Sequence, residues 1–227
     1  HQGKKGENSR KGTPTGDMGS ALVSLRRIYF KFCGKTDIYK YTDGRMNMDS
    51  QNKNTVFSHA ASCARLNECT STAPASSLRA QLRQSCAEIN AAYRLVEARF
   101  GSAASMPSSC RWLLDNRYLA LREAKRAGGA LRDVRRLRAG GDGVILSVLC
   151  RDMIKVCSGK LSEDNMLEYL AGFQSVSPLP QAELYLLPAV LLVQLTFSLA
   201  DACRKLKTTA EPENLDEEFA ALFGSVR

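Results

Sequence analysis

Apolar positions recur at intervals of three and four residues from Thr55 onward, and this spacing places side chains on one face of an α-helix. The longest stripe follows Pro74, which interrupts the pattern. Ser76 or Ser77 is the expected cap of a helix that runs to about Phe100. Its apolar stripe is formed by Leu78, Leu82, Cys86, Ile89, Tyr93 and Val96. We therefore expect a long helix that packs on one side.

Two shorter patterns flank this helix in the sequence. Before Pro74, helical spacing relates His59, Cys63 and Leu66. After Pro107-Ser108-Ser109, where a serine hydroxyl can accept a bond from a free helix amide, another helix is expected to begin. Its stripe is formed by Leu114, Tyr118 and Leu121, flanked by Trp112 and Leu119, and it closes at Gly128-Gly129.

The next stretch is expected to be irregular. Leu131–Arg138 is interpreted as a basic, amphipathic turn or two, and Ala139–Gly143 as a flexible joint, because glycine dominates it. The helix Val144–Cys157 follows, with one side formed by Ile145, Leu149, Met153 and Val156.

Ser162 is the expected N-cap of the following helix. Glu163 and Asp164 come directly after it, where the positive end of a helix favours carboxylates. Leu161 and Met166 occupy the two positions of a hydrophobic staple. The sequence therefore predicts a well-defined helix start here.

The last helix is expected to begin near Pro180 and to run to Lys205. Its central stretch, Leu184–Ala200, has 17 residues and no charge. A membrane span needs about 20 apolar residues. This stretch is shorter, and it contains Pro188 and Gln194. We interpret it as a helix that is buried on most sides rather than as a transmembrane segment.

The predicted fold is all-α, an antiparallel bundle of five to six helices with short polar connections. Three regions are expected. Residues 1–50 form a basic segment that is largely disordered or derived from cloning. Residues 55–206 form the helical bundle domain, and residues 207–227 form an acidic linker with a short amphipathic helix, Leu215 to Phe223, able to dock on this or another domain.

Charge is distributed unevenly along the chain. Lys and Arg number 32 and Asp and Glu 23, a net charge of +9. Residues 111–138 hold nine basic and three acidic groups, whereas residues 207–227 hold two basic and five acidic groups. A basic balance is compatible with nucleic acid, anionic lipid or acidic partners, and also with a solvated arginine-rich face.

The eight cysteines do not form a metal-binding pattern. They include no CxxC pair, and only His59 lies where it could join the nearest pairs, Cys63 with Cys69 and Cys150 with Cys157. We expect buried, reduced thiols of a cytosolic protein, with no metal and no cofactor. The polar opening of the chain, residues 1–17, does not resemble a secretory signal.

The residue types point to no catalytic site. A nucleophile needs a base nearby, and the only internal histidine is His59. The glycines of 139–143 have no preceding strand and no following Lys-Ser/Thr of a phosphate-binding loop. The acidic residues Glu163, Asp164 and Glu168 are interpreted as a helix start and a solvated face.

Two segments resemble the N-terminal helical region of cyclic β-1,2-glucan synthases. The first is Trp112-Leu113-Leu114-Asp115-Asn116, followed by Tyr118-Leu119. The second runs from Gly159-Lys160-Leu161-Ser162-Glu163 through Phe173-Gln174-Ser175-Val176-Ser177-Pro178-Leu179 to Glu183-Leu184. The resemblance covers residues 55–206, and it departs from the family at 180–185, where the family usually has Thr-Ile-Gly-Glu-Leu-Trp.

This resemblance implies a particular place in a larger enzyme. The family's proteins are very large, membrane-associated glycosyltransferases that join glucose from UDP-glucose into β-1,2-linked chains. A transferase domain follows the helical region, and no catalytic residue of the family lies in the segment matched. The chain is thus expected to be a non-catalytic scaffold, in the cytoplasm or at the cytoplasmic face of the inner membrane, with the downstream transferase domain as its partner.

Eight residues are candidates for interaction. Asp115 and Asn116 are interpreted first as an interhelical hydrogen bond or cap that fixes the bundle register, and second as a contact with the transferase domain. Trp112 and Tyr118 are interpreted first as core-filling aromatics and second as sugar-stacking groups. A solvated face, or else a site for anionic lipid or an acidic domain, is formed by Arg132, Arg135, Arg136 and Arg138.

A second class of function stays open from the sequence. The chain is also compatible with a free-standing basic helical module that binds an anionic membrane surface or, less favoured, nucleic acid. Binding of that kind weakens steeply with salt, because it is driven by released counterions.

Overall fold

The computed structural model describes residues 50–100, 106–157 and 161–208. Within these ranges the chain forms six helices and three short strands. In chain order the elements are α2 (Ser50–Leu66), β1 (Ser71–Pro74), α3 (Ala75–Phe100), α4 (Ser108–Ala130), β2 (Arg136–Gly140), β3 (Gly143–Val144), α5 (Ile145–Val156), α6 (Glu163–Gln174) and α7 (Gln181–Thr208). The all-α fold predicted from the sequence is confirmed, with a small sheet added to it.

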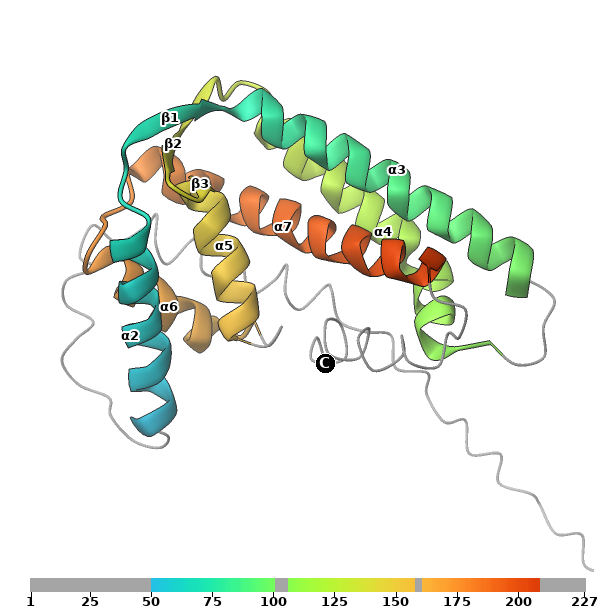
Figure 1. Ribbon diagram of the computed structural model, residues 1–227, viewed down its shortest axis with the longest axis horizontal. Coiled ribbons are helices and arrows are strands. Elements are labelled where there is room, and N and C mark those ends of the chain that lie inside the picture. Colours follow the sequence, from blue (N-terminus) through green and yellow to red (C-terminus); the bar gives the residue numbers. More distant parts are fainter. Residues whose placement is uncertain (1–49, 101–105, 158–160, 209–227) are drawn as a thin grey trace, which may run out of the picture.

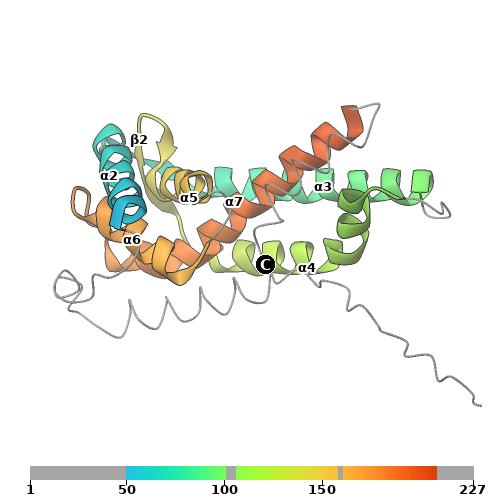
Figure 2. The ribbon, with the colours of Figure 1, turned by 90° about the horizontal axis from the view of Figure 1, so that it is seen from below.

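The helices form two groups that meet along α7. The long helices α3, α4 and α7 lie side by side, with α4 running back against the direction of α3 and α7 (Figure 1). The shorter helices α2, α5 and α6 gather at the end where the sheet lies (Figure 2). Helix α7 contacts α3, α4 and α5, and thereby joins the two groups.

Two apolar clusters follow from this arrangement. The larger one lies at the sheet end and includes Leu187, Val190 and Leu191 from the first half of α7. The smaller one lies between the far ends of α3, α4 and α7 and includes Leu199 and Cys203. The prediction that the last helix is buried on most sides is correct for both halves, although α7 is also the one helix of the described residues that is long and apolar enough to cross a membrane.

The sheet corrects one part of the sequence interpretation. Residues 136–140, predicted as part of a basic helical turn and a flexible joint, form β2, which pairs with β1 on one side and β3 on the other, both antiparallel. Arg136 and Arg138 alternate with the buried Leu137 and Ala139, which is the period of a strand. Gly141-Asp142 makes the hairpin loop, and Gly143 adopts a positive φ of 108°.

The predicted helix starts have mixed outcomes. Ser162 caps α6 as predicted, because its hydroxyl accepts a 3.2 Å bond from the Asn165 amide. Helix α4 has Pro107 at the N-cap position and no side-chain cap bond there. Helix α3 begins at Ala75, and Ser77 donates its hydroxyl to the Pro74 carbonyl at 2.8 Å instead of capping the helix.

The stripe predicted for α3 is largely correct, and the stripe for α2 is not. Leu78, Leu82, Ile89 and Val96 are buried, whereas Cys86 and Tyr93 are half-buried. In α2 the buried apolar positions are Val56, Ala60, Ala61, Cys63 and Ala64, while His59 and Leu66 are exposed. Small residues form the buried face of α2 because this helix crosses α6 at close range.

Predictions made for residues 1–49, 101–105, 158–160 and 209–227 lie outside the described residues. They include the disordered N-terminal segment and the short helix expected between Leu215 and Phe223.

We predict that the close crossing of α2 and α6 depends on Gly172. A Cβ atom at this position would lie 2.4 Å from the carbonyl oxygen of Phe57, a contact that backbone atoms cannot relieve without moving the helices apart. Gly172→Ala is expected to lower the free energy of unfolding by about 1–3 kcal/mol in urea titrations.

The matched control is Gly129→Ala in α4, where the added Cβ meets no atom within 4 Å. Because alanine favours a helix more than glycine does, this variant should match the parent or exceed its stability by up to about 1 kcal/mol. Equal urea midpoints for Gly172→Ala and the parent would show that the crossing is looser than described.

Candidate functional site

The structure does not bring the eight predicted residues together. Four of them, from Trp112 to Tyr118, lie in the first half of α4. The four arginines lie beyond the end of that helix, in the connection after α4 and in β2. At 1.5 Å per residue, the distance along α4 from Asp115 to its end at Ala130 is about 22 Å. The candidates therefore belong to two surfaces.

On α4, the motif Trp112–Asn116 is divided between core and solvent. Leu113 is fully buried, Trp112 is half-buried against the smaller cluster, and Asp115 is exposed. Asn116 donates its amide to the Trp112 carbonyl of the same helix at 2.9 Å, so the predicted interhelical role does not apply to this bond. Tyr118, predicted to fill the core, is 76% exposed.

Small residues explain why Tyr118 is displaced from the core. The buried face of α4 is formed by Cys110, Leu113, Ala120, Ala124 and Ala127. Cysteine and alanine allow α3 and α7 to approach closely, so the larger side chains of α4 are turned away from them. The predicted stripe of Leu114, Tyr118 and Leu121 is therefore rotated away from the true buried face, and both of these leucines are half-buried.

Of the four arginines, Arg138 has a structural partner. Its guanidinium donates to the Glu183 carboxylate through Nε at 3.1 Å and Nη2 at 2.8 Å. Glu183 is only 6% exposed and lies in the first turn of α7. This hydrogen bond to Glu183 raises the pKa of Arg138 above its usual value. The expectation of a solvated face is thus wrong for Arg138, which joins the sheet to α7.

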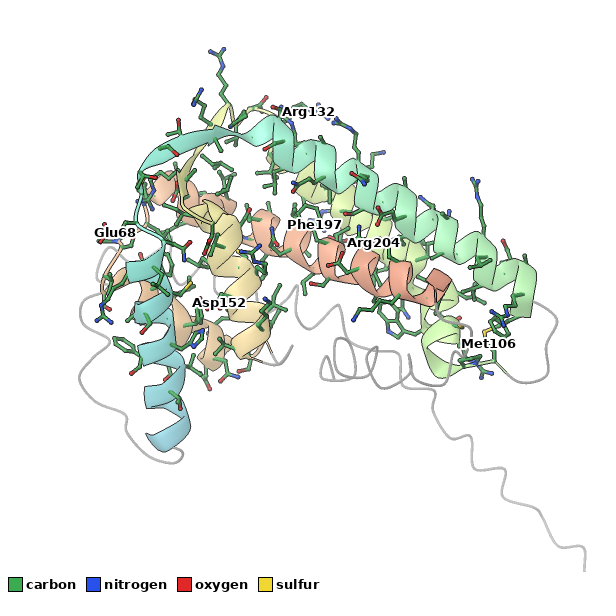
Figure 3. The ribbon with its side chains drawn as sticks, viewed as in Figure 1. Glu68, Met106, Arg132, Asp152, Phe197 and Arg204 are labelled. Atoms are coloured by element: carbon green, nitrogen blue, oxygen red, sulfur yellow. The ribbon has the colours of Figure 1, made fainter. Side chains whose placement is uncertain are left out.

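The other three arginines are exposed, as predicted. Arg132 and Arg135 lie in the connection between α4 and β2. Arg132 lies near the start of α3 (Figure 3), and the Arg135 carbonyl accepts a 3.0 Å bond from the amide of Ala75, the first residue of that helix. Arg136 lies on β2 and donates to the Thr72 hydroxyl at 2.6 Å and to its carbonyl at 2.9 Å, across the strand pair. Arg79 of α3 holds this connection in place by donating to the carbonyl of Leu131 at 2.6 Å.

The nine basic side chains between residues 111 and 138 differ in exposure and in their partners. Arg117 is half-buried, donates to Asn90 at 2.8 Å and stacks over the Tyr93 ring at 4.2 Å. Arg138 is paired with Glu183. The exposed ones are Arg111, Arg122, Lys125, Arg126, Arg132, Arg135 and Arg136. Of the three carboxylates in the same stretch, Glu123 is buried and bound by Arg122 and Arg126.

A polar cluster that the sequence did not reveal lies between α2, α5 and α6. Asp152 of α5, labelled in Figure 3, accepts a 2.6 Å bond from the Tyr169 hydroxyl of α6. Nε2 of His59 in α2 lies 3.1 Å from the Oδ2 atom of Asp152. Cys63, one helical turn after His59, is buried in the same cluster and has Tyr169 and Asp152 as neighbours. The spacing of His59 and Cys63 was visible in the sequence, but nothing in the sequence placed Asp152 and Tyr169 beside them.

The chemistry of this cluster is that of a structural contact. Burial raises the pKa of the Cys63 thiol, and the neighbouring Asp152 carboxylate raises it further. Burial and the bond to Asp152 likewise raise the pKa of Tyr169. A reactive thiol needs the opposite shift. The cluster therefore holds uncharged hydroxyl and thiol groups that fasten three helices together.

Three further cysteines, Cys86, Cys150 and Cys157, follow the same rule. The seven cysteines in the described ranges form no disulfide, and five of them are buried, as predicted. Burial raises the pKa of Cys157 to about 11 and that of Cys150 further still. Within the residues that the structure describes, no group of three or more His, Cys, Asp or Glu side chains is arranged to hold a metal ion.

Comparison of the chain with protein-family models, with curated protein sequences and with solved structures yields no match.

We predict that the Arg138–Glu183 pair is required for stability. Arg138→Met leaves the Glu183 carboxylate buried without its partner. The expected loss in free energy of unfolding is about 2–4 kcal/mol. This loss is smaller than for a fully buried pair, because the Arg138 side chain is 24% exposed. Glu183→Gln keeps a hydrogen-bond acceptor and should cost less, about 1–2 kcal/mol.

Arg135→Ala provides the control from the same basic stretch. Its side chain is exposed, so the change should stay within about 0.5 kcal/mol in thermal or urea unfolding. If Arg138→Met and Arg135→Ala unfold at the same urea concentration, the pair carries no stability.

Proposed function

We propose that this chain is a non-catalytic helical interaction region of a glycosyltransferase that makes β-1,2-glucan from UDP-glucose. Its role would be to position the transferase domain at the cytoplasmic face of the membrane. Support comes from the resemblance of residues 55–206 to the N-terminal region of cyclic β-1,2-glucan synthases. An interior filled with apolar side chains, unactivated thiols and paired charges agrees with a role that requires no catalysis by these helices.

The observation that carries the proposal is the exposure of Asp115 and Tyr118. Both belong to the segment by which the chain resembles the family, and neither is used by the core. They lie three residues apart on α4 and therefore on one face of the helix. A tyrosine that is 76% exposed offers a large apolar area with a polar tip, which suits a protein interface.

The first test is binding to a separately produced β-1,2-glucan transferase domain. The parent chain should bind the domain or raise its activity with UDP-glucose. Tyr118→Ala with Asp115→Ala is expected to weaken binding at least about 10-fold in calorimetry, because an interface aromatic often contributes about 2 kcal/mol. Lys155→Ala, an exposed change on α5, is the control and should leave binding unchanged.

Two results would refute the proposal together. One is the absence of association between the chain and the transferase domain. The other is full glucan synthesis by the whole enzyme after deletion of residues 55–206.

A second candidate function is favoured by the seven exposed cations between residues 111 and 138. In this alternative the chain is a basic module that binds an anionic membrane surface, with nucleic acid as the less favoured ligand. Arg132 and Arg135 are the residues best placed for such contact, since both side chains are exposed in a connection outside the helical core.

We predict that any such binding depends strongly on salt. Affinity for vesicles containing phosphatidylserine should fall steeply from 50 to 300 mM NaCl, and Arg132→Gln with Arg135→Gln should reduce it roughly 10-fold or more, at about 1 kcal/mol for each cation near the surface. Sedimentation with vesicles measures this, and neutral phosphatidylcholine vesicles are the control. Affinity that is absent, or that does not change with salt, would exclude the alternative.

A further inference from the structure

Helix α2 is attached to the rest of the fold more weakly than the long helices are. It packs mainly on α6 and to a smaller extent on α5, and it lies at the edge of the described structure (Figure 1). Burial stabilises a side chain in proportion to its apolar area, so a buried face made mostly of small residues contributes little to docking. The buried apolar residues of α2 are Val56, Ala60, Ala61, Cys63 and Ala64. Such an element is able to open separately from the core.

The residue that follows α2 adds a cost to the docked position. Asn67 is 3% exposed, and its side-chain amide donates to the Cys63 carbonyl at 3.0 Å. Its Oδ1 atom is buried and has no hydrogen-bond partner among the described residues. A buried acceptor without a partner disfavours docking, because water satisfies the same atom when the helix opens.

A polar contact with α5 opposes this opening. Nε2 of His59 lies 3.1 Å from Oδ2 and 3.3 Å from Oδ1 of Asp152. Oδ2 also accepts the 2.6 Å bond from the Tyr169 hydroxyl, so α2, α5 and α6 meet at one carboxylate. The His59 side chain is 51% exposed, and the ring can therefore exchange protons with water while it stays beside the carboxylate.

The other charged groups around this contact do not replace His59. Asp142 of the hairpin and Glu168 of α6 are carboxylates, and their fields act on the neighbouring cysteines. The cations Arg151 and Lys155 of α5 are exposed. In the described part of the chain, His59 is the one group able to carry a positive charge that lies within ion-pair distance of the α5 carboxylate.

We propose that the contact between His59 and Asp152 is a pH-sensitive latch that holds α2 closed while His59 is protonated. Histidine is the side chain that changes its charge near neutral pH. The protonated ring adds the attraction of opposite charges to the hydrogen bond, whereas the neutral ring has the hydrogen bond alone. Helix α2 is therefore docked most firmly in mildly acidic solution and opens more often as the pH rises past neutrality. This latch does not depend on the proposed function.

The other groups of the cluster keep their protonation state between pH 5.5 and 8. Burial raises the pKa of Cys63 and of Tyr169, so the thiol and the hydroxyl stay protonated throughout this interval. Carboxyl groups ordinarily titrate near pH 4, which is below the interval. A change in the docking of α2 over the interval therefore reports on His59.

Amide hydrogen exchange of the whole chain measures the opening of α2. After correction for the intrinsic pH dependence of exchange, the protection of residues 60–66 should fall about 2- to 5-fold between pH 5.5 and 8. That size is typical of an ion pair that is partly exposed to water. The protection of residues 85–96 in α3 should stay constant over the same interval, because α3 takes no part in the contact.

Three variants separate charge from packing. His59→Gln keeps a polar side chain but cannot be protonated, so α2 should be less protected than in the parent at pH 5.5 and should not respond to pH. Asp152→Asn should likewise remove the response. His59→Lys carries a positive charge over the whole interval, so its α2 should be better protected than in His59→Gln, at every pH. Arg151→Gln, an exposed change beside Asp152, is the matched control and should keep the response of the parent.

Three outcomes would overturn the latch. The first is an α2 whose protection in the parent does not change between pH 5.5 and 8. The second is a pH response that persists in His59→Gln. The third is equal protection of α2 in His59→Lys and His59→Gln, which would show that positive charge does not hold the helix. Far-UV circular dichroism and the protection of α3 verify in each variant that the core is folded, so that a change in α2 is distinguished from general unfolding.

Discussion

The burial of α7 is the constraint on which the arrangement of the other helices depends. A helix of 28 residues whose central stretch is uncharged cannot remain in water without covering that surface. Two groups of elements cover this helix. The first half of α7 is covered by α5, β2 and the end of α3 nearest the sheet, and the second half is covered by the ends of α3 and α4 farthest from the sheet. Both ends of α3 and α4 are therefore positioned by one helix. A membrane would satisfy the same surface, but here most of the apolar stretch is enclosed by protein.

Polar contacts then determine how the shorter elements attach to this centre. The Arg138–Glu183 pair fastens β2 to the first turn of α7, and Asp152 holds Tyr169 of α6 and His59 of α2. Each contact joins elements that are far apart in the sequence and satisfies groups whose burial would otherwise be costly. In the described part of the chain, these charged and hydrogen-bonding side chains act as connectors between the elements of the fold.

The spacing of apolar residues was sufficient to predict where the helices lie, because each helix covers a long stretch of sequence with one apolar side. It failed where size rather than polarity decided burial. In α4 and α2 the core selects alanine and cysteine, so Tyr118 and Leu66 are exposed although both are large and apolar. The strand β2 was missed because Leu137 and Ala139, which alternate with Arg136 and Arg138, fit a short helical turn as well as a strand. Only the pairing with β1 and β3 distinguishes the two structures. The partners of Arg138 and Asp152 depend on contacts across 45 and 17 residues or more, which no local pattern encodes.

The division of α4 into a side of small residues and a side of large ones has a consequence for function. A helix that needed only to complete a bundle would place its aromatic residues inward, where they contribute most to stability. Here the inward positions are occupied by Ala120, Ala124 and Ala127, and Tyr118 stands in water among arginines. Exposed aromatic area mixed with cations is unfavourable to leave uncovered and favourable to cover with a surface that is itself apolar and acidic. The described part of α4 therefore presents its largest exposed aromatic side chain to solvent, while its small residues set the close packing against α3 and α7.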